Sequence, residues 1–295
     1  MSGVVLCVGA LSLDTIFRLE ALPSGSGKFL PTEAIEVAQG MATAQAASVV
    51  RLGGKARLWA SCGDDANGDR IVRDLTQAGV DLSALRRVPG ARSGFSSIFM
   101  DKVGERMIVP FYDLAIRAAP EALPSMDDVA VVSVDARWPA AAEMALLAAR
   151  ERGIPGVFDA DVAPTEVLRR LAPLASHVVA SEKVCQPLFG VDDPVAALET
   201  VGGDFVVITA GERGCYWAED DAIQHLPAPQ IEAVDTLAAG DVFHGAFAFG
   251  LAEGWDTERN LRFATIAAAL KCTKFGGRLG APTRAEVEAL LSFSP

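Results

Sequence analysis

The sequence predicts an α/β fold, a three-layer α/β/α sandwich with a mostly parallel central sheet. Two observations predict it: short apolar runs alternate with longer helical patterns, and 51% of the 295 residues are hydrophobic. Alternation of this kind is typical of parallel sheets that carry helices on both faces. The length and the apolar content allow one large core and exclude disorder, so we expect a single domain over residues 1–295.

The expected elements follow one another in strand–helix order. Short apolar runs predict buried strands at 4–8, 57–61, 129–134, 156–158, 177–180, 205–209 and 231–234. Helical patterns lie at 43–52, 67–78, 140–152, 165–171, 194–201, 241–253, 257–271 and 284–291. In sheets of this class, ligands bind in the loops that follow the strands.

Two stretches, at about 15–38 and 92–112, break the alternation because they are polar, extended and interrupted by Gly and Pro. Within the second stretch, residues 96–100 and 106–109 flank a turn at 101–105, which predicts a hairpin. We expect the two insertions to form a small antiparallel β lid over the main sheet. A lid would exclude water from a reaction, and the alternative is a surface decoration without such a role.

Composition narrows the class of protein. The net charge is −12 without a basic stripe, which argues against nucleic acid and membrane surfaces as partners. The five cysteines are far apart and form no C-x-x-C motif, as in a reduced cytoplasmic protein, and three scattered histidines argue against a His-based metal site. Residues 1–9 lack the pattern of a signal peptide, and no apolar run approaches bilayer length.

The segment 235–241, Asp-Thr-Leu-Ala-Ala-Gly-Asp, carries the most chemical information. The small residues Ala238, Ala239 and Gly240 let backbone N–H groups point at an anion, and the following helix adds unpaired donors and partial positive charge. A carboxylate beside such an anion hole suits a base, so Asp241 is placed to take a proton from a hydroxyl that attacks a phosphoryl group. The alternative is a simple helix cap.

This segment resembles the C-terminal signature of the ribokinase-like (PfkB) carbohydrate kinases, D-T-x-[GA]-A-G-D, and weaker resemblance covers nearly the whole chain. The resemblance implies an ATP-dependent kinase in which Asp241 is the base. The backbone around Ala238, Ala239 and Gly240, together with Mg²⁺, would stabilise the transferred charge. The sequence contains no G-x-x-x-x-G-K-[ST] motif, which excludes P-loop chemistry.

The resemblance also implies a nucleotide site. Thr209, Gly211 and Gly214 follow a predicted strand and resemble the family's T-x-G-x-x-G loop, which lines the nucleotide together with Gly240 and the region of Lys271. Taken alone, a Gly-x-x-Gly pair after a strand is more simply a turn.

Two metal roles are implied by the same resemblance. Ser181-Glu182 resembles part of an N-x-x-E motif that organises Mg²⁺ mainly through water, so Glu182 is the implied Mg²⁺ residue. The family often surrounds a monovalent cation, K⁺, with the residue at Asp235 and the loop at 276–280.

On the sugar side, Asp14 matches a family carboxylate that accepts hydrogen bonds from sugar hydroxyls, although alone it could be a loop or cap residue. Gly40 belongs to a sugar-contacting Gly-Gly pair in the family. Here Gln39 replaces the first glycine of that pair, and Ala44 replaces a neighbouring Asn. The sugar contacts in this corner therefore differ from the family pattern.

Several short runs, among them Ser26-Gly27-Lys28 and Asp135-Ala136-Arg137-Trp138, resemble one branch of the family, the 6-deoxy-6-sulfofructose kinases. Lys28 and Arg137 would suit an anionic substituent on the sugar. The alternative is that Arg137 pairs with Asp135 or Asp159 and that Lys28 is solvated. We expect transfer to a primary hydroxyl of a ketose or an anionic sugar such as 6-deoxy-6-sulfofructose, with 2-keto-3-deoxygluconate and sugar phosphates also open.

Three further readings stay open at this point. A nucleoside kinase of the same fold could use Phe111 or Trp138 as a platform for a base. A non-catalytic sensor of sugars or nucleotides would fit the changes at Gln39 and Ala44. A homodimer through the lid is plausible because an exposed sheet edge invites pairing.

Overall fold

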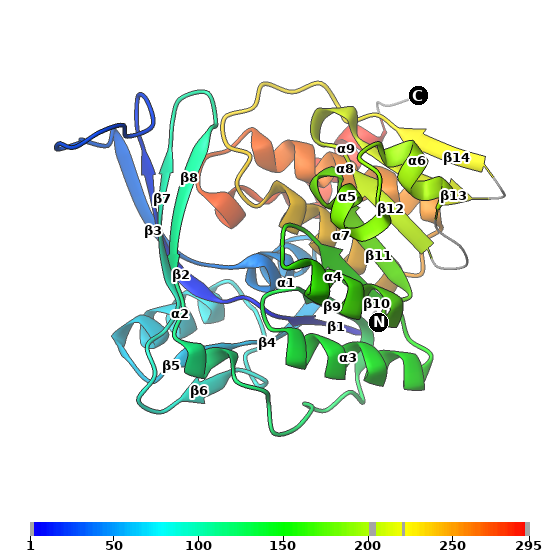
Figure 1. Cartoon of the computed structure of the whole chain (residues 1–295), viewed down its shortest axis with the longest axis horizontal. Coiled ribbons are helices and arrows are strands. Elements are labelled where there is room, and N and C mark those ends of the chain that lie inside the picture. Colours follow the sequence, from blue (N-terminus) through cyan, green and yellow to red (C-terminus); the bar gives the residue numbers. More distant parts are fainter. Residues whose placement is uncertain (1–2, 201–204, 220–221, 293–295) are drawn as a thin grey trace.

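A computed structural model describes residues 3–200, 205–219 and 222–292. Its centre is a sheet in the order β14-β13-β12-β11-β10-β9-β1-β4 (Figure 1). The strands are β1 (Val4–Val8), β4 (Lys55–Trp59), β9 (Val129–Asp135), β10 (Gly156–Ala160), β11 (His177–Ser181), β12 (Phe205–Thr209), β13 (Cys215–Glu219) and β14 (Ala222–Leu226). The pairs from β4 to β12 are parallel, and β13 and β14 add an antiparallel edge.

Helices cover both faces of this sheet, which confirms the three-layer sandwich (Figure 1). One face carries α1 (Met41–Arg51), α2 (Ala66–Gln77), α7 (Ala239–Ala252), α8 (Thr257–Cys272) and α9 (Arg284–Leu291). The other carries α3 (Pro139–Arg152), α4 (Thr165–Leu171), α5 (Cys185–Phe189) and α6 (Pro194–Glu199). Successive strand residues enter opposite cores: Cys7 lies in the first, and Leu6 and Val8 lie in the second.

A second sheet, which we call the lid, stands beside the main one (Figure 1). It contains β2 (Ser12–Arg18), β3 (Glu33–Gln39), β7 (Phe95–Met100) and β8 (Arg106–Phe111) in the order β3-β2-β7-β8. The two predicted insertions therefore meet in one sheet. Its outer pairs are antiparallel as expected, but β2 and β7 run parallel. A short parallel pair, β5 (Ser61–Gly63) with β6 (Arg86–Val88), lies outside both sheets.

Two details of the predicted element order were wrong. Residues 231–234 are not a strand: Ile231 is exposed, and the N–H of Val234 bonds to the carbonyl of Cys272 at the end of α8 instead of to a strand. The β13–β14 hairpin was not predicted, because its burial pattern follows no clean alternation. The predicted helix at 194–201 ends at Glu199 in the structure, and Val201 lies outside the described residues.

The cysteines are mostly buried, as predicted. All but Cys272 are buried. Burial raises the pKa of Cys62, Cys185 and Cys215 to about 11, so these thiols stay protonated at neutral pH. Among the described residues, no helix is long and apolar enough to cross a membrane.

Helices α1 and α7 cross at a point where only glycine fits. A Cβ atom on Gly245 of α7 would lie 2.6 Å from the carbonyl oxygen of Gln45 and 2.9 Å from the Cβ atom of Ser48, both in α1. The close contact holds the start of α7 against the helix that follows the lid.

We predict that Gly245→Ala lowers the free energy of unfolding by about 1–3 kcal/mol, the usual effect of overpacking a core contact. Alanine favours a helix over glycine by ~1 kcal/mol, so the clash must exceed that gain. Urea unfolding followed by circular dichroism measures the change. Stability equal to or above that of the wild type would contradict the crossing described here.

Candidate active site

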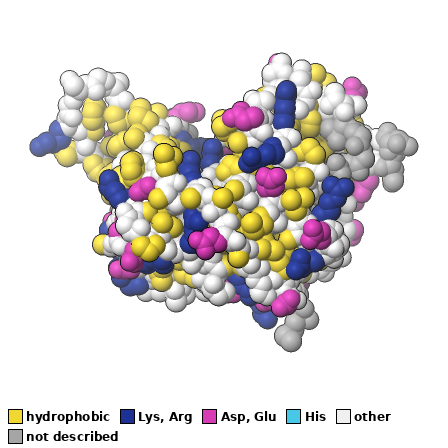
Figure 2. All heavy atoms as spheres, turned by 60° about the horizontal axis from the view of Figure 1, so that its bottom comes forward, with side chains coloured by type: hydrophobic (Ala, Val, Ile, Leu, Met, Phe, Trp, Pro, Cys, Tyr) yellow, Lys and Arg dark blue, Asp and Glu magenta, His cyan; other side chains and the backbone are white. Residues whose placement is uncertain are grey.

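The candidate site lies where the parallel strands of the main sheet end. Strand β9 ends at Asp135, Asp159 and Asp161 lie at the end of β10, and Glu182 and Ala210 follow β11 and β12. Because the carboxyl ends of parallel strands lie along one edge of a sheet, these residues share one side of the molecule. Figure 2 shows a hollow between the projecting lid and the main body.

The N-terminus of α7 carries unpartnered backbone donors where the anion hole was predicted, with one change. Ala238 turns the chain into the helix with φ of 64°, a value that no other non-glycine residue reaches in the described chain. The N–H of Ala239 points to the carbonyl of Thr236 (3.3 Å). The N–H groups of Gly240 and Asp241 have no partner in the described part of the chain, and the space beside Gly240 is open. These two groups, not Ala239, are the free donors.

The carboxylate of Asp241 is half-buried, with no hydrogen bond or ion pair to any described residue. Burial raises its pKa to about 8, the nearby charges of Asp159, Asp161 and Asp135 add to the increase, and His244 opposes it. A carboxyl group whose pKa lies close to neutral pH is suited to accepting and releasing a proton in that pH range.

His244 lies one helical turn after Asp241 and connects it to a buried polar chain. Its Nδ1 lies 2.7 Å from the carbonyl of Gly240, and its Nε2 lies 3.3 Å from Oδ1 of Asp159. Oδ2 of Asp159 accepts from Gln45 (2.8 Å), whose own oxygen accepts from the Ser133 hydroxyl. Burial and the charges of Asp161 and Asp135 raise the pKa of Asp159, and Nε2 of His244 also lies 3.2 Å from the carbonyl of Val179.

Asp135 has a structural role. Its carboxylate accepts backbone N–H bonds from Ala10 (2.7 Å), Ala42 (2.9 Å) and Arg137 (2.7 Å) and so ties β1, α1 and β9 together. Only the backbone of Arg137 takes part. The Arg137 guanidinium forms no direct ion pair with Asp135 or Asp159 in the described chain, but its positive charge acts to lower the pKa of both carboxyl groups.

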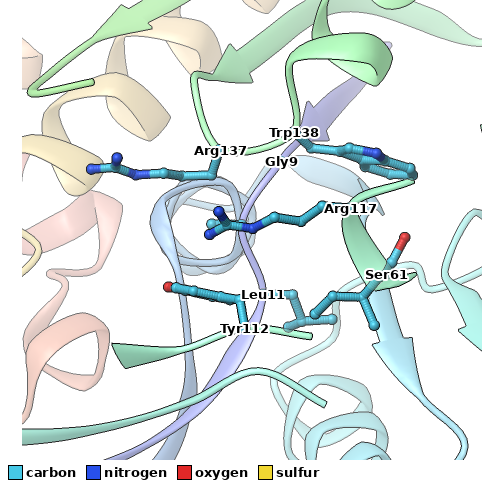
Figure 3. Close-up of a pocket in the computed structure, with 9 residues that line it drawn as sticks. Gly9, Leu11, Ser61, Tyr112, Arg117, Arg137 and Trp138 are labelled. Atoms are coloured by element: carbon cyan, nitrogen blue, oxygen red, sulfur yellow. The ribbon is translucent and has the colours of Figure 1, made fainter. Parts of the chain in front are cut away.

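The guanidinium of Arg137 instead lines a pocket with Arg117 and Tyr112. The polar ends of the three side chains extend in the same direction (Figure 3). The guanidinium of Arg117 lies 4.1 Å from the centre of the Tyr112 ring. Neither arginine forms a direct ion pair with a carboxylate of the described residues, so two guanidinium groups line the pocket without a contacting carboxylate.

Asp14 lies close to this pocket and is buried, with one carboxylate oxygen lacking any partner. Burial raises its pKa to about 6, against the lowering effect of hydrogen bonds with Ser12 and Ser96. The charges of Asp14, Arg117 and Arg137 all act on the hydroxyl of Tyr112. The free oxygen can accept a ligand hydroxyl, as predicted for this residue.

Other predicted sugar-side residues lie in different environments. Gly40 has φ of 115°, and a Cβ there would lie 2.4 Å from the carbonyl of Ala10, so glycine is needed at the entrance to α1. Gln39 is buried with a free side-chain oxygen, whereas Ala44 is buried in the core. Lys28 lies in the exposed β2–β3 loop and does not line the pocket of Arg137.

The predicted nucleotide loop leads from β12 into the 3₁₀ turn Gly211–Arg213. A Cβ on Gly214 would lie 1.9 Å from the carbonyl of Leu226, so packing explains this glycine. Gly211 is exposed with φ of 58°, and Thr209 bonds to the carbonyl of Ala180. The side chain of Arg213 in this turn forms an ion pair with Glu182, the predicted Mg²⁺ residue.

The predicted cation residue, Asp235, is fully buried, and so is Lys271, whose Nζ lies 3.0 Å from Oδ2 of Asp235. The ammonium of Lys271, expected near the nucleotide, therefore lies beneath the loop before α7 and not on its surface. The described residues contain no group of three or more His, Cys, Asp or Glu side chains that could hold a metal ion.

Sequence reasoning missed Arg117, Tyr112 and the pair of His244 with Asp159. Arg117 belongs to no motif, and only the fold brings it beside Arg137. The sequence did contain a signal for this pair. Asp159 lies within an apolar strand, and His244 lies within an apolar helix. An ionisable side chain that is buried in an apolar segment needs a polar partner.

We predict that Asp241→Asn changes stability in a pH-dependent way. With a folded-state pKa of about 8 against an ordinary 3.8, Asp241 contributes stability that is present below pH 3.8 and is lost as the pH rises towards 8. Asparagine cannot ionise and keeps that stability. The melting temperature of the variant should rise relative to the wild type between pH 5 and pH 9, by about 2–4 °C per kcal/mol relieved. A constant difference at the two pH values would contradict the raised pKa.

A family model and similar curated proteins point to the same family. The model of the pfkB family carbohydrate kinases matches residues 4–284. Ribokinase of Bacillus subtilis is 30% identical over 294 residues, covering 98% of this chain and 99% of its own. The ATP-dependent ribose-1-phosphate kinase of Halopiger xanaduensis is 31% identical over 301 residues, covering 98% of each chain.

A solved structure agrees with these matches. A crystal structure from Agrobacterium tumefaciens, provisionally described as a ribokinase, is 46% identical with a TM-score of 0.96, covering 99% of this chain and 98% of its own. The chain thus belongs to the pfkB family of carbohydrate kinases, which are phosphotransferases with a hydroxyl group as acceptor.

Proposed function

We propose that this protein transfers the γ-phosphoryl group of ATP to a primary hydroxyl of a sugar, with Asp241 as the base. One observation carries the proposal. A carboxylate with a pKa of about 8 and no hydrogen-bond or ion-pair partner stands beside the two unpartnered N–H groups of Gly240 and Asp241. A base and an anion hole in one helical turn are the two parts that phosphoryl transfer to an alcohol requires.

In this proposal each residue of the site has one role in the reaction. Asp241 takes the proton from the attacking hydroxyl, and Asp14 accepts a bond from a second hydroxyl to orient the sugar. The N–H groups of Gly240 and Asp241 stabilise the charge on the transferred group. The nucleotide would lie along the loop of Thr209, Gly211 and Gly214.

Mg²⁺ would screen the charge of the phosphates. The residues present fit a Mg²⁺ that keeps most of its waters, because such an ion needs only one or two carboxylates besides phosphates. Glu182 is our choice, since one of its oxygens stays free of the ion pair with Arg213.

The pocket supports an anionic sugar over a neutral one. Arg117 and Arg137 bring two guanidinium groups without a carboxylate partner in the described chain, and Tyr112 adds a hydroxyl (Figure 3). Guanidinium groups bind sulfonate, phosphate or carboxylate through paired hydrogen bonds. A phosphorylated sugar, as in the Halopiger xanaduensis relative, or 6-deoxy-6-sulfofructose would suit this pocket. A role for Lys28 stays a prediction.

The alternatives have less support. A nucleoside kinase would need an aromatic platform, but Trp138 is buried with its Nε1 donating to Ala118, and Phe111 stacks on Phe95 in the lid. A sensor has no use for the base Asp241.

A homodimer through the lid is supported by the edge strand β8, whose exposed apolar residues are Met107, Ile108, Val109 and Phe111. Figure 2 shows apolar side chains on the projecting lid.

We predict that Asp241→Asn lowers turnover by ~10²-fold or more, because a positioned base contributes at least that much. Release of ADP from Mg-ATP should be measured with 6-deoxy-6-sulfofructose, fructose, fructose 6-phosphate, ribose, ribose 1-phosphate, 2-keto-3-deoxygluconate and adenosine. Near-normal turnover in a folded variant would reject Asp241 as the base. A signal with adenosine alone would favour the nucleoside kinase.

We also predict that Arg117→Ala and Arg137→Ala each raise KM for the preferred anionic sugar by about 10–100-fold, the equivalent of one lost charged hydrogen bond. The turnover number and the KM for ATP should change little. Arg73→Ala, on the exposed face of α2, is the matched control. Equal effects on neutral and anionic sugars would argue against an anion site.

A further inference from the structure

The surroundings of Asp235 differ from those of a cation site. Its Oδ2 accepts hydrogen bonds from the N–H groups of Gly276 and Gly277, both at 2.9 Å, and lies 3.0 Å from Nζ of Lys271. Its Oδ1 accepts from the N–H of Leu237 (2.7 Å). Its backbone carbonyl accepts a second bond from Lys271, at 2.6 Å. The carboxylate therefore has one acceptor position left.

A monovalent metal ion does not fit here. It would need several oxygen ligands, and the oxygens that Asp235 offers already face N–H groups and an ammonium. The carboxylate is fully buried and its negative charge needs a positive partner, because an unpaired buried charge is strongly unfavourable. Lys271, equally buried, supplies that charge from within the chain. Burial lowers the pKa of Lys271, and the charge of Asp235 opposes this.

We infer that the ammonium of Lys271 replaces the monovalent cation that the family resemblance implied, so that the protein works without K⁺. The ammonium carries the same single charge and donates its hydrogen bonds to the carboxylate and carbonyl oxygens of Asp235. The reach of the Lys271 side chain from the end of α8 fixes its position. A bound ion would depend on its concentration, whereas this charge is always present.

The pair acts on the anion hole through a short path. The N–H of Leu237 bonds to Asp235, and the N–H of Ala239 bonds to the carbonyl of Thr236. Gly240 and Asp241, whose N–H groups are free, come directly after Ala239 in the sequence. On the other side, Asp235 holds the N–H groups of Gly276 and Gly277, where φ is positive. Lys271 is thus a positioning residue for both loops.

The first test compares the wild type in KCl, NaCl and tetramethylammonium chloride at equal ionic strength, with Mg-ATP held constant. We expect the same turnover and the same melting temperature in all three salts. A loss of turnover or of melting temperature when tetramethylammonium replaces K⁺ would overturn the inference. The turnover measurement rests on the proposed kinase activity, but the melting temperature does not. The two proposals can therefore fail separately.

The second test uses two substitutions that differ only in the space they leave. Lys271→Ala removes the charge and opens a cavity, whereas Lys271→Met removes the charge and fills the same space. In tetramethylammonium both should melt at a lower temperature and lose turnover by ~10-fold or more, since small shifts of catalytic groups are costly. K⁺ or NH₄⁺ should restore Lys271→Ala, by binding the folded state, and leave Lys271→Met unchanged.

Lys274→Ala is the matched control, because Lys274 lies one turn away and its ammonium forms a surface ion pair with Glu286. It should behave as the wild type in every salt. Full turnover and an unchanged melting temperature of Lys271→Ala in tetramethylammonium would show that the charge is not needed. Equal rescue of Lys271→Met by K⁺ would point to a cation site elsewhere. Either result would overturn the inference.

Discussion

Burial of carboxylates beside one edge of the main sheet is the constraint on which the rest of the site depends. Removing a charge from water is unfavourable unless hydrogen bonds or an opposite charge replace the solvent. Asp135 uses backbone N–H groups, Asp235 uses Lys271, and Asp159 uses His244 and Gln45. Asp241 alone of these four has no hydrogen-bond or ion-pair partner in the described chain, and burial raises its pKa to about 8.

The same bonds hold distant segments in place. Asp135 joins the loop after β1 to the start of α1, and Asp235 joins the end of α8 to the loop before α7. Leu237, between Asp235 and the anion hole, packs on Ile16, Val37 and Ile98 of the lid. The segment that leads into the anion hole therefore packs directly on the lid, so a shift of the lid would move the backbone of this segment.

The sequence was sufficient for the overall architecture. The strands at 4–8 and 205–209 and the helices at 165–171 and 284–291 agree residue for residue, because uniform burial or a clear helical period marks them. The segment at 231–234 was predicted wrongly because a short apolar run does not reveal whether a neighbouring strand is available. The β13–β14 hairpin was missed because its side chains are neither uniformly buried nor regularly alternating.

For the site, the sequence by itself determined the chemistry of the segment at 235–241, since the fixed order of small and acidic residues before a helix sets both donors and base. Only the tertiary structure decided what surrounds it. Arg117 meets Arg137, His244 meets Asp159, and Lys271 meets Asp235 across separations of 20, 85 and 36 residues. These pairs are long-range side-chain contacts, and the spacing of residues along a chain carries no record of which strands and helices the fold places side by side.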